Sequence, residues 1–184
     1  MTGSTGLHDG KRNRYADSFR EAADLLIAQT LQGAANQESA LYPIVYLYRQ
    51  YLELSIKDSL QMTRLLLDDR RAVLPHHRVV ELWQELNEFL VKILPGDAQP
   101  GLVQTARLVR EFIQHDTSAT VFRHPVDVKG RPLFVHAAII DLANLRDVMG
   151  KVDGILSQAN GIIYERWKAG QAPQQQRPAP DNDI

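Results

Sequence analysis

The chain has 184 residues, of which 44% are hydrophobic and 23% are charged, and its formal net charge is −1. This composition fits one globular domain and argues against intrinsic disorder and against nucleic-acid binding through bulk charge. The absence of cysteine excludes disulfides, Cys-based zinc sites and thiol nucleophiles. No uncharged apolar run approaches about 18 residues and no signal-peptide core is present, so we expect a cytoplasmic protein without a membrane span.

The two ends of the chain differ in composition from its middle. Residues 1–12 are small, polar and glycine-rich, which predicts a disordered leader. Residues 170–184 are rich in Pro and Gln and predict a disordered tail. The helical domain is therefore expected to span residues 13–169.

Hydrophobic residues between these ends recur at helical spacing. The pattern predicts helices over residues 13–31, 38–69, 77–94, 102–114 and 136–167. Periodicity is lost over residues 116–134, which indicates a long irregular loop, and such loops are often functional. The predicted fold is all-α, a helical bundle of about five helices with one long loop.

The second predicted helix is apolar around almost its whole circumference, which indicates that neighbouring helices bury it. One polar row interrupts it: Arg49, Glu53 and Lys57, four residues apart and therefore on one face. The row has two interpretations. It is either a solvated ladder of ion pairs, or a buried row that meets charges from elsewhere, with Arg123 or Asp127 of the long loop as candidate partners, because buried charges need partners.

Adjacent histidines precede the third predicted helix. His76 and His77 follow a pair of aspartates, but their spacing matches no zinc-binding pattern, so neither a metal site nor a cofactor is predicted. We expect one of these histidines to cap the helix and the other to be exposed.

Arg110 and His115 lie near the C-terminal end of the fourth predicted helix, with four residues between them. Histidine titrates near neutrality and can take a proton from a ribose 2′-OH, while arginine stabilises the charge that develops on phosphate. The pair therefore fits metal-independent cleavage of a phosphodiester. The alternative is an arginine that faces solvent and a histidine that ends a helix; the same spacing recurs at Arg71–His76 and Arg131–His136.

The long loop contains the segment FRHPVDVKG, residues 122–130. One interpretation is a structural loop in which Arg123 pairs with Asp127. The other is a surface that binds phosphate or a partner protein through Arg123, His124, Asp127 and Lys129.

Four stretches together resemble the HEPN superfamily, small helical proteins of prokaryotic toxin–antitoxin and anti-phage systems. YLYRQYLELSIKDSL resembles its long early helix. HHRVVELWQEL is similar to a His-x-Leu-x-x-Leu opening of the next helix, with His77 at the first position. REFIQH, which begins at Arg110 and ends at His115, resembles the Arg-Asn-x-x-x-His pattern, with Glu111 in place of Asn. FRHPVDVKG resembles an FRYP-x-D-x-x-G segment, with His124 in place of Tyr.

The resemblance implies an all-α homodimer in which Arg110 and His115 of both subunits form one metal-independent RNA-cleaving site. It also implies a role in anti-phage defence or a toxin–antitoxin system, with RNA or an effector or antitoxin protein as partner. The alternative is a non-catalytic helical module that binds a partner protein or nucleic acid through the long loop and the Arg49–Glu53–Lys57 row.

Overall fold

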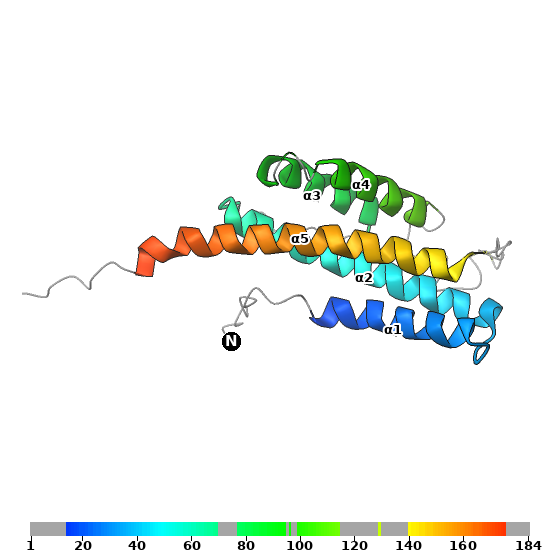
Figure 1. Ribbon diagram of the computed structural model, residues 1–184. Coiled ribbons are helices and arrows are strands. Elements are labelled where there is room, and N and C mark those ends of the chain that lie inside the picture. The colour runs from blue at the N-terminus through cyan, green and yellow to red at the C-terminus, as the bar shows by residue number, and fades with distance from the viewer. Residues whose placement is uncertain are drawn as a thin grey trace, which may run out of the picture.

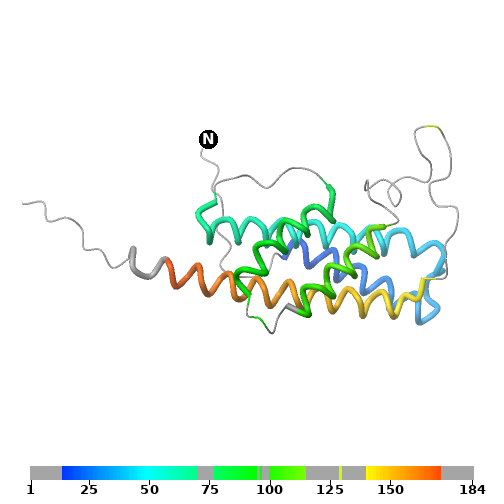
Figure 2. Tube along the Cα trace, turned by 90° about the horizontal axis from the view of Figure 1, so that it is seen from above, coloured from blue at the N-terminus to red at the C-terminus, as the bar shows by residue number. Residues whose placement is uncertain are grey.

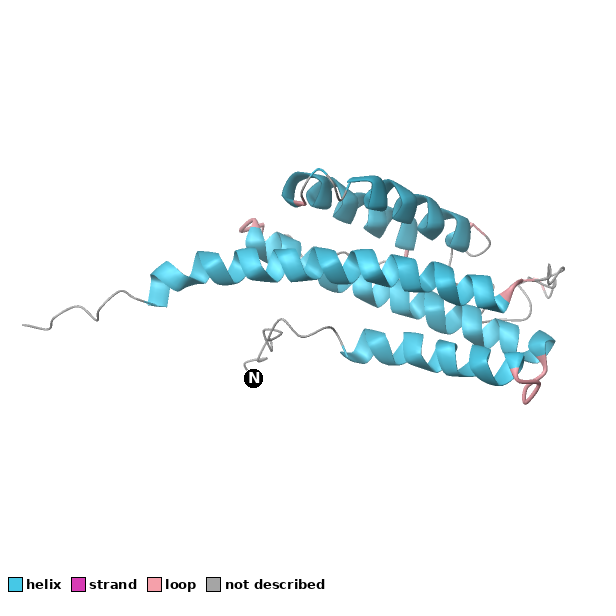
Figure 3. Ribbon diagram, in the orientation of Figure 1, coloured by secondary structure: helices cyan, strands magenta, loops and turns pink. Residues whose placement is uncertain are grey.

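The computed structural model describes residues 14–69, 77–94, 96, 99–114, 129 and 140–175, with side chains to residue 170. Its elements are α1 (Arg14–Leu31), α2 (Gln37–Leu66), α3 (Val79–Ile93), α4 (Gln99–Ile113) and α5 (Leu142–Gln175). No strand occurs in these ranges (Figure 3), and the predicted all-α bundle is confirmed. Apart from Lys129, the predicted leader and long loop lie outside the described residues.

Helix α2 is the centre of the bundle, because it packs against α1, α3 and α5. Figure 1 shows α1 on one side of α2 and the α3–α4 hairpin on the opposite side, with the long α5 running beside α2. Seen from above in Figure 2, α3 and α4 run obliquely to α2 and α5. Helix α4 also contacts α5, so the hairpin closes the bundle over both long helices.

The sequence of α2 explains its central place. Ile44, Tyr48, Leu52, Ile56 and Leu60 are spaced four residues apart, and each has 0% of its surface exposed. Other buried apolar residues widen this stripe until neighbours are needed on several sides. The helix begins after an Asn N-cap whose side chain accepts a hydrogen bond from a backbone N–H in the first turn. Its burial confirms the interpretation of this stretch as a helix covered by the others.

Helix α4 begins at Gln99, three residues before the predicted start. Pro100 follows in the first turn, where the N–H that proline lacks would have no intrahelical acceptor. Gly101 brings the start of α4 close to α5, because a Cβ added there would lie 2.6 Å from Cδ1 of Ile155.

Helix α5 differs from its predicted range at both ends. It begins at Leu142 rather than at residue 136, after Asp141, whose carboxylate accepts a hydrogen bond from the backbone N of Asn144 at 3.0 Å. It continues to Gln175, so residues 170–175 are helical where a disordered tail was predicted. None of the helices within the described ranges is long and apolar enough to cross a membrane.

Candidate functional site

The polar row of α2 lies against the start of α3 and is buried. Arg49 and Glu53 are each 2% exposed, and Lys57 is half-buried. Nη1 of Arg49 lies 3.3 Å from Oε2 of Glu53, and Nζ of Lys57 lies 2.8 Å from Oε1. The interpretation of the row as a solvated ladder is therefore wrong for Arg49 and Glu53, and the buried interpretation holds.

The polar row contacts His77, one of the two adjacent histidines that precede α3. Nδ1 of His77 lies 2.7 Å from Oε1 of Glu53. Nη2 of Arg49 donates a hydrogen bond to the backbone carbonyl of the same histidine at 2.8 Å. Arg49 and Glu53 thus hold His77 by its main chain and by its ring, while 56% of the histidine side chain stays exposed. The partners predicted from the long loop, Arg123 and Asp127, lie outside the described residues.

Glu53 is anionic in this setting. Burial by itself raises the pKa of the Glu53 carboxyl, but the hydrogen bonds from Lys57 and His77, together with their charges, lower the pKa below its ordinary value. Arg49 adds a further donor on the other carboxylate oxygen. A buried carboxylate with this many donors has its desolvation cost offset, which is the condition under which a buried charge is tolerated.

Of the two adjacent histidines, His77 fits the member predicted to be exposed rather than the member predicted to cap α3. The N-cap of α3 is Arg78, and its side chain makes no capping hydrogen bond. His77 stands one residue earlier and turns its ring toward α2 instead, because the buried carboxylate of Glu53 offers a stronger acceptor site. His76 lies outside the described residues.

The charged contact between α2 and α3 continues about two turns beyond the predicted row. Arg64, seven residues after Lys57 and 4% exposed, pairs with Glu85 of α3. Sequence analysis did not single out Arg64, although its position on the face of Lys57 follows from helical periodicity. The α2–α3 interface is therefore fixed by two groups of charges as well as by apolar packing.

Arg110 is exposed in the last turn of α4. Within the described residues it has no ion pair, and the neighbouring Glu111 is paired with Arg107 instead, at 3.5 Å. His115, the second member of the predicted pair, lies outside the described residues, as do Arg123, His124 and Asp127. The geometry of the Arg110–His115 pair therefore stays a prediction.

The antiparallel α3–α4 hairpin places His77 and Arg110 at the same end of the hairpin. The N-terminal end of α3, which His77 precedes, and the C-terminal end of α4, which carries Arg110, lie at the same end of the hairpin (Figures 1 and 2). An imidazole held by a buried carboxylate and a guanidinium exposed to solvent are therefore on the same part of the molecule. Sequence analysis missed His77 as the partner of Glu53, although the need of a buried carboxylate for a nearby donor could have pointed to it.

In the part of the chain that the structure describes, no group of three or more His, Asp and Glu side chains is arranged to hold a metal ion. What the cluster can do chemically is transfer a proton. One ring nitrogen of His77 is engaged by Glu53, which leaves Nε2 as the nitrogen that can exchange protons with a bound molecule.

No known protein family, no curated protein and no solved structure matches this chain. The likeness to HEPN proteins accordingly rests on the four sequence stretches quoted above.

Proposed function

We propose that the protein is a HEPN-like endoribonuclease that cleaves RNA without a metal ion, in anti-phage defence or a toxin–antitoxin system. In this proposal the protein is a cytoplasmic homodimer, Arg110 binds the scissile phosphate, and His115 transfers a proton. The observation that supports it most directly is the state of Arg110, whose guanidinium is exposed at a helix end and has no ion pair among the described residues.

The position of Glu111 bears on this role, because a carboxylate beside a phosphate-binding arginine would compete with the phosphate. Glu111 is turned toward Arg107, one turn back along α4, with Nε of Arg107 3.5 Å from its Oε1. The two side chains are 69% and 56% exposed, so the pair adds little to stability. Its relevance is that it directs the negative charge away from Arg110.

The reaction needs no cofactor. The ribose 2′-oxygen attacks the adjacent phosphorus as its proton is removed, the bond from phosphorus to the 5′-oxygen breaks, and that oxygen receives a proton. The products are a 2′,3′-cyclic phosphate and a 5′-hydroxyl. Arginine contributes by stabilising the negative charge that the phosphoryl oxygens gain in the transition state.

The test is incubation of the purified protein with total RNA in EDTA, beside Arg110→Ala and His115→Ala. We expect the wild type to cleave and each variant to lose at least about 100-fold in rate, the usual contribution of an acid–base or charge-stabilising group. Arg166→Ala, at an exposed arginine on α5, is the matched control and should cleave like the wild type. Cleavage by His115→Ala at the wild-type rate would rule out this site.

A second function, that of a non-catalytic binding module, is supported by a groove between α4 and α5. The groove holds about 270 Å³. Its apolar lining comprises Leu108, Phe112, Ile140, Leu145 and Val148. The carboxylates of Glu111 and Asp141 also line it, which suits an apolar segment of a partner protein that carries positive charge. This function predicts that no variant cleaves RNA and that changes at Arg123 or Asp127 abolish partner binding.

A further inference from the structure

Helix α5 has one face that no other part of the described chain covers. It packs against α1, α2 and α4, and Figure 1 shows it in front of α2 with no other helix over its outer side. That side carries seven exposed residues, spaced alternately four and three apart and therefore on one face. These residues, which we call the outer row, are Asp147, Lys151, Gly154, Gln158, Gly161, Glu165 and Lys168.

The glycines of this helix are unusual for an interior that faces solvent. Gly150, Gly154 and Gly161 are exposed, and a Cβ added at any of them would have nothing within 4 Å of it beyond the helix itself. Glycine at such a position destabilises a helix relative to alanine. At Gly101, by contrast, a Cβ would clash with the side chain of Ile155. Nothing in the described chain requires the three glycines of α5, whereas the close approach of a second helix would.

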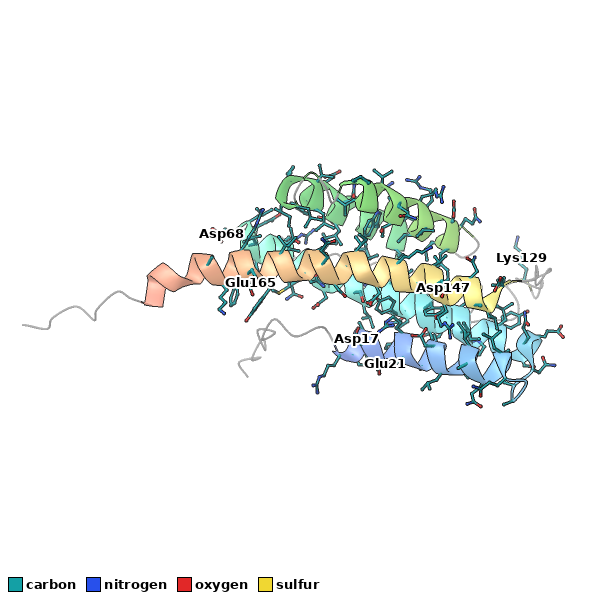
Figure 4. All side chains as sticks on the ribbon, in the orientation of Figure 1. Asp17, Glu21, Asp68, Lys129, Asp147 and Glu165 are labelled. Carbon is teal, nitrogen blue, oxygen red and sulfur yellow. The ribbon has the colours of Figure 1, made fainter. Side chains whose placement is uncertain are left out.

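The charges of the outer row make no ion pair with any described residue. Asp147 and Lys151 are four residues apart, a spacing at which such pairs form, yet they are not paired. Glu165 and Lys168 are likewise exposed and unpaired among the described residues. Figure 4 labels Asp147 and Glu165, which lie towards opposite ends of the row. Each end of the row therefore offers one acid and one base to a partner.

The outer row is complementary to itself when two copies run antiparallel. With Gln158 on the twofold axis, each acid of one copy faces a base of the other, and each glycine of the row faces a glycine. The facing pairs are Asp147–Lys168, Lys151–Glu165 and Gly154–Gly161.

Other arrangements of the same two faces oppose like charges. In a parallel pair each charged residue would face its own copy. Sliding the antiparallel pair by one layer in one direction places Asp147 opposite Glu165. Sliding it in the other direction places Lys151 opposite Lys168. The charge pattern therefore selects one orientation and one register.

We infer that the outer row of α5 is a self-association surface, through which two copies of this chain pair antiparallel about Gln158. The inference goes beyond the proposed function, because the row includes no residue of the proposed RNA-cleaving site and would stand without RNA cleavage. The ion pairs set orientation and register but add little affinity, because they are exposed. The contact area comes from the close approach of the two helices that the glycines allow.

This pairing differs from the dimer that the HEPN resemblance implies. Leu145 of α5 lines the groove together with Glu111, the residue after Arg110 in the last turn of α4. Leu145 lies about 20 Å from Gln158 along the helix. The two copies of Arg110 would therefore be about 40 Å apart, so each subunit would carry its own. A site shared between two Arg110 residues would need a different interface.

The first experiment measures association of the full-length protein by analytical ultracentrifugation over a range of concentrations. The wild type is expected to pass from monomer to dimer. Lys151→Glu and Glu165→Lys should each weaken dimerisation at least about 10-fold, because like charges then face each other on both sides of the axis. The double variant restores opposite charges and should associate like the wild type. Lys92→Glu, the same charge change at an exposed position of α3, is the matched control and should leave dimerisation unchanged.

Gly154→Leu separates association from folding. Within one copy the new side chain meets open space, so at low concentration the variant should unfold at the wild-type temperature or above it. Between copies the side chain would stand where the backbones approach, so dimerisation should be lost. A Gly154→Leu variant that dimerises like the wild type would overturn the inference.

Because the chain has no cysteine, one introduced cysteine reports the register. Gln158→Cys should form a disulfide-linked dimer on mild oxidation, since its two copies meet at the axis. Lys151→Cys should not, because its two copies lie about 20 Å apart.

The outcomes separate this inference from the proposed function. A wild type that stays monomeric at every concentration overturns the inference, as does a dimer that crosslinks through Arg110→Cys and not through Gln158→Cys. RNA cleavage without association through α5 overturns the inference alone. Association through α5 without RNA cleavage supports the inference and overturns the proposed function alone.

Discussion

The protein contains two polar clusters on opposite sides of α2, one centred on a buried ion pair and the other on hydrogen bonds from phenols to carboxylates. The α2/α3 cluster comprises Arg49, Glu53, Lys57 and His77, and its central ion pair has side chains only 2% and 3% exposed. Within it the charged Arg49 and Lys57 pair with the carboxylate of Glu53, and the imidazole of His77 is 56% exposed. Its stability depends on complete charge compensation, because a buried charge that loses its partner is costly.

The other cluster links α1, α2 and α5. Two neutral phenols donate to carboxylates: Tyr48 to Asp24 at 2.5 Å and Tyr51 to Asp153 at 2.6 Å. Arg20 lies between the carboxylates, 3.2 Å from Asp24 and 3.8 Å from Asp153. Burial, together with the hydrogen bond to Asp24, raises the pKa of Tyr48 and keeps it neutral.

The difference lies in what each cluster presents to solvent. In the α1/α5 cluster the carboxylates are 30% and 15% exposed and partly solvated, and they accept hydrogen bonds from the phenols of α2 and pair with Arg20 of α1. In the α2/α3 cluster the ion pair is buried and the exposed group is a histidine. The first arrangement fixes three helices to one another, whereas the second also orients a group that can exchange protons.

The largest effect should follow from breaking the buried ion pair. Arg49→Met and Glu53→Leu should each lower the free energy of unfolding by about 3–5 kcal/mol, because each removes one partner of a charge that stays buried. The double variant should recover most of this loss, since two apolar side chains of similar size replace the pair and Lys57 can turn to solvent. Urea denaturation of the three variants measures the effect. Losses in the single variants below about 0.5 kcal/mol would show that the Arg49–Glu53 pair does not stabilise the fold.

A smaller effect is expected in the α1/α5 cluster. Tyr48→Phe and Tyr51→Phe should each cost about 1.5–3 kcal/mol, the range for a hydrogen bond to a charged group. Tyr164→Phe is the matched control, since its ring stacks on Trp167 and its hydroxyl makes no hydrogen bond with any of the described residues. It should change the free energy of unfolding by less than about 0.5 kcal/mol. If all three variants unfold at the same urea concentration, the phenol–carboxylate hydrogen bonds contribute nothing to the free energy of unfolding.

The smallest effect is the pH dependence carried by Glu53 alone. Its folded pKa is lowered, so its contribution to stability is fully present above the unfolded value of about 4.3 and is lost as pH falls through the folded value. The difference in unfolding free energy between wild type and Glu53→Gln should therefore be constant near neutral pH and shrink in acid. Urea denaturation from pH 7 to pH 3 measures it. A difference that grows in acid would contradict the lowered pKa.

Periodicity predicted the five helices because apolar spacing records which faces are buried. It placed α1 within one residue at its start, and it singled out Arg49, Glu53 and Lys57 as an interruption of an apolar helix. It misplaced the start of α5, because the capping contact of Asp141 is a local side-chain geometry rather than a periodic signal.

For a related reason, periodicity could not predict which residue contacts the polar row. Which residue meets a buried carboxylate depends on how two helices cross, and the spacing of residues within each helix does not determine that crossing. Sequence analysis proposed partners from the long loop because that loop is irregular and charged. His77, two residues before the start of α3, is the group that the fold places beside Glu53.

Helix α5 is longer than the bundle that supports it. Up to residue 170, where the described side chains end, its last buried residue is Ile163. The helix continues twelve residues further, to Gln175, and this stretch includes Glu165, an exposed residue labelled in Figure 4. A helical stretch of that length is marginal in water without packing. Amide hydrogens beyond Ile163 should therefore exchange with solvent far faster than those beside α2, so that the same helix contains both the slowest and some of the fastest exchanging amides of the domain.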